Sequence, residues 1–211
     1  MKIVTASEMS RIEKLAIQRG ASEEQFMERA GQAVAHCAEE YISLHDLSHS
    51  VILLVGKGNN AGDAYVAGSV LQGKGFHVRA ISIYPKDAYS PLCKHMADRF
   101  ERQGGRIDFH TLEWGSDGLI IDGLVGTGFQ GRAEGILAEA IHGANSSRLP
   151  ILAIDIPSGL NGSTGEAGEK VIHATMTLFL GLPKTYSDPR KGRRSQCCRL
   201  QNLRPLNGNP Q

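Results

Sequence analysis

The sequence predicts an α/β fold in which helices cover both faces of a mainly parallel sheet, giving three layers in the order αβα. Short apolar runs rich in β-branched residues alternate with segments of helical period, which is the pattern of a doubly wound sheet. The clearest run is 51–55, and a glycine-spaced polar loop over 56–63 follows it directly. Glycine-containing polar loops also follow the apolar runs 119–124 and 151–154. Loops at the carboxyl ends of parallel strands share one edge of the sheet, so these loops are expected to meet in one crevice.

Two helices are expected before the first strand. Residues 7–20 carry apolar side chains at three- and four-residue spacing, and Ser22 with Gln25 forms a capping box that opens a second helix. The second helix has an apolar stripe made of Met27, Ala30, Val34, Cys37 and Tyr41. We interpret this stripe as a packing face, and His36 and His45 lie off it, so both are expected at the surface.

The remaining elements continue the alternation of strands and helices. After the glycine-spaced loop, a helix is expected to begin at Ala64 and to end near Gly73. The elements expected next are strand 78–83, a helix that opens at Ser90 and Pro91, strand 119–124, a helix over 133–144, strand 151–154 and an edge strand within 174–180. No strand-like period follows residue 183. The sheet is therefore expected to end with an unpaired edge.

Composition indicates one domain followed by a tail of different charge. The chain has 211 residues, 41% of them hydrophobic, and a net charge of +1; a chain of this length can bury a substantial core. Residues 1–183 hold 16 Lys and Arg against 21 Asp and Glu, whereas residues 184–211 hold seven basic residues and one acid. We therefore expect a domain over 1–183 and a basic, poorly ordered or aberrant tail over 184–211. A basic tail can bind nucleic acid, but a solvated chain end is the favoured interpretation, and no nucleic-acid partner is expected.

Cysteine usage and hydropathy bear on the compartment. Cys37, Cys93, Cys197 and Cys198 form no CxxC pair and have no ligand-like spacing with histidines, which favours a reducing compartment and no structural zinc. No segment approaches the roughly 20 continuous apolar residues that span a bilayer, and the first residues lack the apolar core of a signal peptide. A cytoplasmic protein without membrane association is expected.

The first polar loop matches a dinucleotide fingerprint in spacing but not in charge. Gly56, Gly58 and Ala61 satisfy G-x-G-x-x-G/A, so an ordinary dinucleotide site is a serious alternative. Such a site places a pyrophosphate at the start of the helix, where Asp63 would repel it. It also needs an acid about 20 residues further on, and the nearest candidate, Asp87, comes late. A second alternative is that Asp63 only caps the helix.

The second and third loops add phosphate-binding groups and oxygen ligands. Backbone N–H donors suited to a phosphate come from Gly126, Thr127, Gly128 and Gly131, with Arg132 close behind. Asp122 ends an apolar strand, where a carboxylate costs on the order of several kcal/mol unless it has a partner. Asn60, Asp122 and Ser158 would offer a hard cation amide, carboxylate and hydroxyl oxygens. With one firm charge, K⁺ is more natural than Zn²⁺; the alternative is a hydrogen-bonded core aspartate.

Asp155 is the candidate for proton transfer. It follows the apolar run 151–154 and precedes Pro157, which turns the chain out of the strand, so its carboxylate is expected to face the crevice. There it could accept hydrogen bonds from ribose hydroxyls or act as a general acid and base. Ser158 is not interpreted as a nucleophile, because I-P-S-G-L is not G-x-S-x-G and no histidine lies at a convincing strand end.

Three ordered motifs resemble one protein family. GNNAGD at 58–63, DGLVGTG at 122–128 and AIDIPSGLNGSTG at 153–165 are similar to motifs of the YjeF N-terminal domain family, as is FMERAG at 26–31. The resemblance covers roughly residues 5–183. It implies a Rossmann-like αβα sandwich and an isomerase that interconverts the R and S epimers of hydrated NADH or NADPH, together NAD(P)HX, in nicotinamide-nucleotide repair. It also implies one bound K⁺ per subunit.

The resemblance assigns roles position by position. The K⁺ ligands that it implies are Asn60, Asp122 and Ser158. The substrate-binding positions that it implies are Asn59, Asn60, Ala61, Gly62, Asp63, Gly126, Thr127, Gly128, Phe129, Gln130, Gly131, Arg132 and Asp155. We expect Asp155 to be catalytic, as the proton carrier beside the carbinolamine oxygen. Ala61 and Ala64 stand where the family more often has glycine, and both are small enough to be tolerated.

The resemblance also bears on partners and on the alternative function. The expected functional partner is a separate NAD(P)HX dehydratase that takes the S form; homodimer formation and the preference between NADHX and NADPHX are left open. The alternative is a non-catalytic nucleotide-, RNA- or protein-binding module on the same fold. The presence of Asn60, Asp122, Asp155 and Ser158 favours catalysis, because a scaffold needs neither an ion site nor an acid in the crevice.

Overall fold

The core of the fold is a seven-stranded sheet in which all strands run parallel, in the order β3-β2-β1-β4-β5-β6-β7. The computed structural model describes residues 20–161 and 168–180, the backbone of 196–198, and residues 11, 15 and 18. The strands are β1 (Ser50–Val55), β2 (His77–Ser82), β3 (Arg106–Phe109), β4 (Leu119–Gly123), β5 (Ile151–Ile154), β6 (Met176–Leu178) and β7 (Gln196–Cys198). The predicted α/β class and parallel sheet are confirmed. Because the strands are parallel, all their carboxyl ends lie at one edge.

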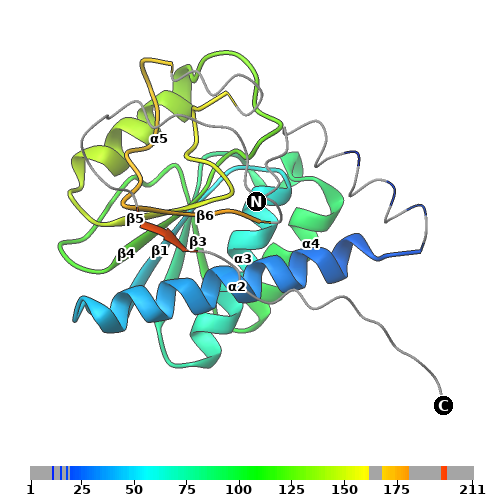
Figure 1. Ribbon diagram of the computed structural model, residues 1–211, viewed down its shortest axis with the longest axis horizontal. Helices are drawn as coiled ribbons and strands as arrows, with labels where there is room; N and C mark the ends of the chain where they lie inside the picture. The colour runs from blue at the N-terminus through cyan, green and yellow to red at the C-terminus, as the bar shows by residue number, and fades with distance from the viewer. Residues whose placement is uncertain are drawn as a thin grey trace.

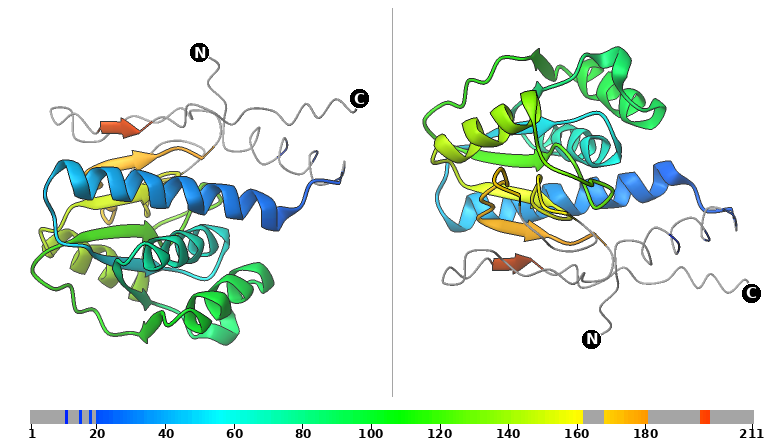
Figure 2. Two further views of the ribbon diagram at one scale, coloured as in Figure 1. Left: turned by 90° about the horizontal axis from the view of Figure 1, so that it is seen from below. Right: turned by 90° about the horizontal axis from the view of Figure 1, so that it is seen from above.

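Helices cover both faces of the sheet (Figure 1). On one face lie α2 (Glu23–Leu44), α3 (Asn59–Gly73) and α4 (Pro91–Arg102), while α5 (Gly135–Ser146) lies on the other. Figure 2 shows α2, α3 and α4 side by side across their face. Each face has its own buried core: Tyr65 and Phe100 belong to the first, and Ile120 and Ile141 to the second. The predicted three-layer arrangement is therefore confirmed.

Helix α2 begins and packs as its sequence predicts. Ser22 Oγ accepts a hydrogen bond from the Gln25 N–H at 3.4 Å, so the predicted N-cap is confirmed. Gly31 marks the point where α2 meets α3, since a Cβ on Gly31 would lie 2.4 Å from the Cβ of Val66. This close approach packs α2 tightly against α3.

The two sides of α2 differ as expected. In the predicted stripe Met27, Val34 and Cys37 are buried and Ala30 and Tyr41 are partly buried. His36 and His45 are exposed, as predicted. The helix expected over 7–20 lies largely outside the described residues. Among the helices that the structure describes, none has both the length and the apolar character needed to cross a membrane.

Helix α3 begins earlier than predicted, at Asn59 instead of Ala64. Gly58 is its N-cap, with φ −108° and ψ −163°, so Asn60 lies in the first turn and Asp63 lies inside the helix. The alternative in which Asp63 caps the helix is therefore wrong. Glycine and asparagine are weak helix formers, but α2, α4 and the sheet bury almost every side of α3. Burial outweighs local propensity here.

The sheet edges also differ from prediction. Strand β3 was not predicted, and β7 pairs with β6, so the expectations of an edge strand at 174–180 and of no strand after residue 183 are wrong. With four and three residues, β3 and β7 are too short to show an alternating pattern in sequence. The other strands and helices agree with prediction to within about two residues. The division at residue 183 stays a prediction.

Candidate active site

Three side chains meet beyond the carboxyl ends of β1, β4 and β5, which are neighbours in the sheet. Asn60 lies in the first turn of α3, Asp122 lies in β4, and Ser158 lies in the loop after β5. Asn60 is 8% exposed, and Asp122 and Ser158 are fully buried. Residues that are far apart in the sequence are thus brought together by adjacent strands.

Hydrogen bonds join Ser158 directly to Asp122. Ser158 Oγ lies 2.6 Å from Asp122 Oδ1, and the Ser158 N–H donates to Asp122 Oδ2 at 2.8 Å. The Leu124 N–H donates to Asp122 Oδ1 at 3.2 Å. These donors are all neutral, and within the described residues no Lys or Arg forms an ion pair with Asp122.

The peptide of Val125 links the third side chain to this pair. Asn60 Nδ2 donates to the Val125 carbonyl at 3.1 Å, and Ser158 Oγ lies 3.1 Å from the same carbonyl oxygen. The Val125 N–H in turn donates to Ser158 Oγ at 3.0 Å. The predicted convergence of Asn60, Asp122 and Ser158 is therefore confirmed, whereas their role as cation ligands stays a prediction.

The charge of Asp122 is the unusual property of this cluster. Burial raises the pKa of Asp122 to about 6, although hydrogen bonds from Ser158 and Leu124 act in the opposite direction. The alternative interpretation, in which Asp122 is only a hydrogen-bonded residue of the core, accounts for these contacts. It leaves the carboxylate without a compensating positive charge. A cation would supply that charge, and the carboxylate, hydroxyl, amide and carbonyl oxygens of the cluster are all hard donors.

The donor set resembles a site for a singly charged ion more than a zinc site. Across the described residues, no three His, Cys, Asp or Glu side chains gather into a metal-ligating group. A cation held by Asn60, Ser158 and the Val125 carbonyl would therefore meet Asp122 as its one anionic ligand. Neutral oxygens with a single carboxylate fit K⁺ better than Zn²⁺.

Glycines allow the loops to approach this closely. The Gly56 N–H donates to the Gly123 carbonyl at 3.2 Å, and a Cβ on Gly56 would lie 2.0 Å from the carbonyl oxygen of Leu124. A Cβ on Gly123 would lie 2.8 Å from the Cβ of Ala64. The loop after β1 thus contacts the backbone of the loop after β4, and α3 packs closely on the end of β4, and neither place has room for a Cβ on these glycines.

Asp155 lies at a sharp turn directly after β5. Its φ is +65°, in the left-handed region, and the Ile156 N–H donates across it to the Ile154 carbonyl at 2.8 Å, which closes a γ-turn. The Asp155 N–H donates to the Leu178 carbonyl of β6 at 2.8 Å. Asp155 is 8% exposed and lies three residues before Ser158. Strained backbone of this kind persists where the surroundings enforce it, and it is frequent at active sites.

The second polar loop lies beside Asn60. The Phe129 N–H donates to the Gly126 carbonyl at 3.0 Å, so Thr127 and Gly128 form the tip of a turn. A Cβ on Gly126 would lie 3.3 Å from Asn60 Oδ1, so the loop passes directly over that amide. The residues that follow, Gln130, Gly131 and Arg132, are exposed. They are accessible to a ligand, and their role in binding it stays a prediction.

The first polar loop supplies fewer accessible groups than predicted. Asn59 is exposed at the start of α3, whereas Ala61, Gly62 and Asp63 are buried. A Cβ on Gly62 would lie 2.5 Å from the Met27 side chain, so close packing of α2 on α3 accounts for this glycine. Substrate contacts at these positions remain predictions.

The Val125 carbonyl is the main feature that the sequence did not reveal. The side chain of Val125 is apolar, and the residue contributes to the cluster through its backbone carbonyl. The one feature of the sequence that could have indicated this role is the position of Val125, three residues after Asp122 in a glycine-containing loop.

The first six strands of the parallel sheet have the order 3-2-1-4-5-6, which is that of the doubly wound α/β class. Proteins of this class bind ligands at the carboxyl edge of the sheet, where the buried polar cluster lies. Residues 23–186 match the family model of the YjeF-related protein N-terminus, and the chain belongs to that family. The predicted family resemblance is thereby confirmed.

Several relatives have names that state an activity. The chain is 34% identical to the NAD(P)H-hydrate epimerase of Rhodopirellula baltica over 75% of its length, and 32% identical to that of Bordetella pertussis strain Tohama I over 90%. It is 32% identical to the bifunctional NAD(P)H-hydrate repair enzyme of Thermofilum pendens over 87% of its length. The yeast protein ynu0 has the same fold, with a TM-score of 0.76, 20% identity, and coverage of 87% of this chain and 82% of the yeast chain.

The relatives differ in how much of their own length is matched. The chain spans 36% of the Thermofilum pendens protein, 65% of the Rhodopirellula baltica protein and 82% of the Bordetella pertussis protein. The range matched by the family model, 23–186, contains all three motifs.

Proposed function

We propose that this chain is an NAD(P)H-hydrate epimerase that interconverts the R and S forms of hydrated NADH and NADPH. The observation that carries the proposal is the position of Asp155, a buried carboxyl group in a strained turn on the same loop as Ser158. The family and the names of the relatives support it.

Epimerisation requires a group that both gives and takes a proton, and a carboxyl group can do this. In one route, the acid form of Asp155 protonates the ring hydroxyl, which leaves as water and produces a planar iminium carbon. Water then adds to the opposite face and returns its proton to the Asp155 carboxylate, so no proton is consumed overall. Ring opening and closure at the same carbon would serve equally, and it too needs a proton carrier beside the carbinolamine oxygen.

We propose that one K⁺ per subunit is held by Asn60, Asp122, Ser158 and the Val125 carbonyl. The support is the oxygen-only donor set around a buried carboxylate that has neutral hydrogen-bond donors. When bound, the ion would supply positive charge that attracts substrate oxygen atoms. The exposed loop over 126–132, including Arg132, would hold the phosphates, and Asn59 would border the same crevice.

The product is proposed to pass to an NAD(P)HX dehydratase that takes the S form. This would place the chain in nicotinamide-nucleotide repair, in agreement with the repair activity in the names of the bifunctional relatives.

A chiral assay tests the proposed function. Purified protein is mixed with S-NADPHX or R-NADPHX, with and without K⁺, and the two epimers are separated by chromatography. Each pure epimer is expected to approach the same mixture, faster in K⁺. Unchanged epimers, together with thermal stabilisation by RNA alone, would contradict the epimerase and favour the binding module.

Stability in K⁺ is expected to depend on pH through Asp122. Its pKa in the folded protein is about 6, against an ordinary 3.8, so protonated Asp122 stabilises the ion-free fold below about pH 4, and this contribution is lost as the pH rises through about 6. K⁺ competes with the proton for the carboxylate. We therefore expect KCl to raise the melting temperature at pH 7.5 relative to N-methylglucamine chloride, and to have little effect at pH 5.

Asp122→Asn is the control for this measurement. The variant keeps the shape of the side chain but has no charge to titrate, so the difference between the two salts should disappear at both pH values. Equal melting temperatures in the two salts at pH 7.5 for the wild-type protein would refute the ion site.

A further inference from the structure

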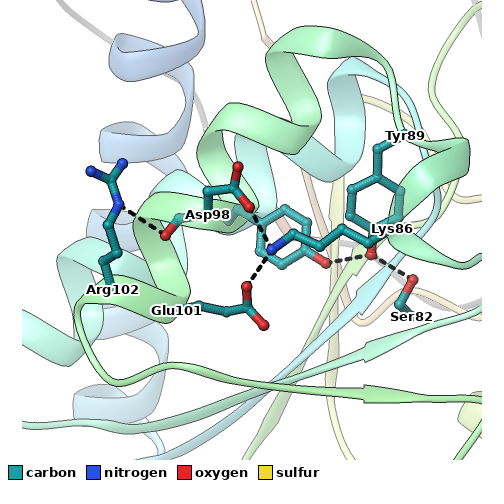
Figure 3. A network of polar contacts seen from close by, with 7 residues as sticks. Ser82, Lys86, Tyr89, Asp98, Glu101 and Arg102 are labelled. Carbon is teal, nitrogen blue, oxygen red and sulfur yellow. Dashed lines mark hydrogen bonds and ion pairs between the residues drawn. The ribbon is translucent and has the colours of Figure 1, made fainter.

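The carboxyl end of β2 carries a buried chain of hydroxyl groups that the proposed chemistry does not use. Tyr65 OH lies 2.7 Å from Tyr89 OH, and Tyr89 OH donates to Ser82 Oγ at 2.6 Å. Ser82 Oγ in turn donates to the Tyr84 carbonyl at 2.7 Å and accepts from the Tyr84 N–H at 3.3 Å. Figure 3 shows the Tyr89 and Ser82 part of this chain. A hydrogen-bonded chain that starts in the core therefore fixes the peptide of Tyr84.

Lys57 lies over the ring of Tyr84. Its Nζ is 4.8 Å from the ring centroid, within the range of a cation–π contact. The Lys57 carbonyl accepts a hydrogen bond from the Ser90 N–H at 2.9 Å, which ties the loop after β1 to the start of α4. Lys57 is exposed, and none of the carboxylates that the structure describes forms an ion pair with it. Its positive charge is therefore available to a ligand.

The nearby Lys86 differs from Lys57 in this respect. Lys86 Nζ lies 2.5 Å from Asp98 Oδ1 and also pairs with Glu101, both on α4 (Figure 3). These acids balance its charge. Of the two lysines beside the end of β2, Lys57 is the one free to attract an anion.

The sheet order indicates which anion would reach this place. Sheets with the order 3-2-1-4-5-6 bind dinucleotides across their carboxyl edge, and the end of the second strand is where the adenosine ribose is recognised. An acid there binds the ribose 2′-hydroxyl, whereas a cation accommodates a 2′-phosphate. Here the acid nearest to the end of β2 in the sequence is the exposed Asp87, five residues after Ser82, whereas Lys57 lies over Tyr84. Strands β5 and β2 are three positions apart, about 14 Å at the usual strand spacing, a distance that an extended dinucleotide covers.

We propose that Lys57 binds the adenosine 2′-phosphate of hydrated NADPH, so that the site prefers NADPHX over NADHX, and that Tyr84 positions the amine. This inference rests on the proposed function, because that function places the reduced nicotinamide ring near Asp155. The ammonium group gains a charge-assisted contact that NADHX, with a free 2′-hydroxyl, cannot make.

Binding of the stable dinucleotides NADPH and NADH, measured by calorimetry, tests the preference without requiring turnover. The wild-type protein is expected to bind NADPH roughly tenfold more tightly than NADH. Lys57→Met should remove this difference by weakening NADPH binding alone, and Lys57→Arg, which keeps the charge, should preserve it. Raising the salt concentration should reduce the preference, because the contact is exposed and ionic.

Lys94→Met is the matched control, since it removes the same charge from an exposed position on α4 and should leave the ratio of the two affinities unchanged. Equal affinities in the wild-type protein, or an equal loss for both dinucleotides in Lys57→Met, would overturn the inference. Absence of epimerisation would refute the proposed function separately, because the ratio of NADPH to NADH affinity does not depend on catalysis.

Discussion

Replacing Asp155 by asparagine is expected to lower the kcat of epimerisation by roughly 10²- to 10⁴-fold, the usual contribution of a positioned acid or base. The substitution removes the ionisable group and little else. Asparagine tolerates the left-handed region about as well as aspartate does, so the γ-turn at φ +65° should persist. The measurement is the rate at which pure R-NADPHX converts to the mixture, together with the melting temperature.

Asp46→Asn is the matched control for Asp155→Asn. Asp46 also has a positive φ, +53°, but it is exposed in the turn after α2. The Asp46→Asn variant should keep wild-type activity, which would show that exchanging an aspartate of positive φ for asparagine does not by itself lower the rate. Epimerisation by Asp155→Asn at the wild-type rate would show that another group moves the proton.

Replacing Gly56 by alanine is expected to destabilise the fold by about 3 kcal/mol, as overpacking of a buried contact does. The new Cβ would lie 2.0 Å from the Leu124 carbonyl oxygen, which is backbone and cannot rotate away. To relieve the clash, the loops after β1 and β4 must separate. For a chain of this size the melting temperature should fall by about 10 °C, measured by calorimetry or circular dichroism.

Gly58→Ala provides the comparison, two residues further along the same loop. A Cβ on Gly58 would have no atom within 4 Å, and its φ of −108° suits any residue. Its loss of stability should stay below about 1 kcal/mol, the scale of a helix cap. Similar melting temperatures for Gly56→Ala and Gly58→Ala would mean that the close backbone approach does not limit stability.

Most of the fold could be predicted from local signals. Strands β1 and β5 are bounded apolar runs, and α4 begins at Ser90 and Pro91, where a cap and a proline mark the helix start. The start of α3 could not be predicted, because its first turn contains weak helix formers and is stabilised by the burial of the helix from Asn60 onward. Short strands such as β3 and β7 are determined by backbone pairing with a neighbour, which leaves no pattern in three or four residues.

The parts of the site that are formed by side chains could be predicted from the sequence, whereas the parts formed by the backbone could not. Placing Asn60, Asp122 and Ser158 together required only that their strands be parallel and adjacent. The contribution of the Val125 carbonyl and the positive φ of Asp155 depend on the path of the loops in three dimensions. Neither has a signature in residue type.

The nearly complete enclosure of α3 has a consequence for how this protein can diverge. A single residue inserted or deleted near the start of α3 would rotate all later side chains of the helix by about 100°, moving buried residues such as Tyr65 and Leu71 out of their packing positions. The exposed segment 130–132 has no such restriction. Changes of length that adapt the protein to new ligands should therefore accumulate after β4, while the segment after β1 keeps a fixed number of residues.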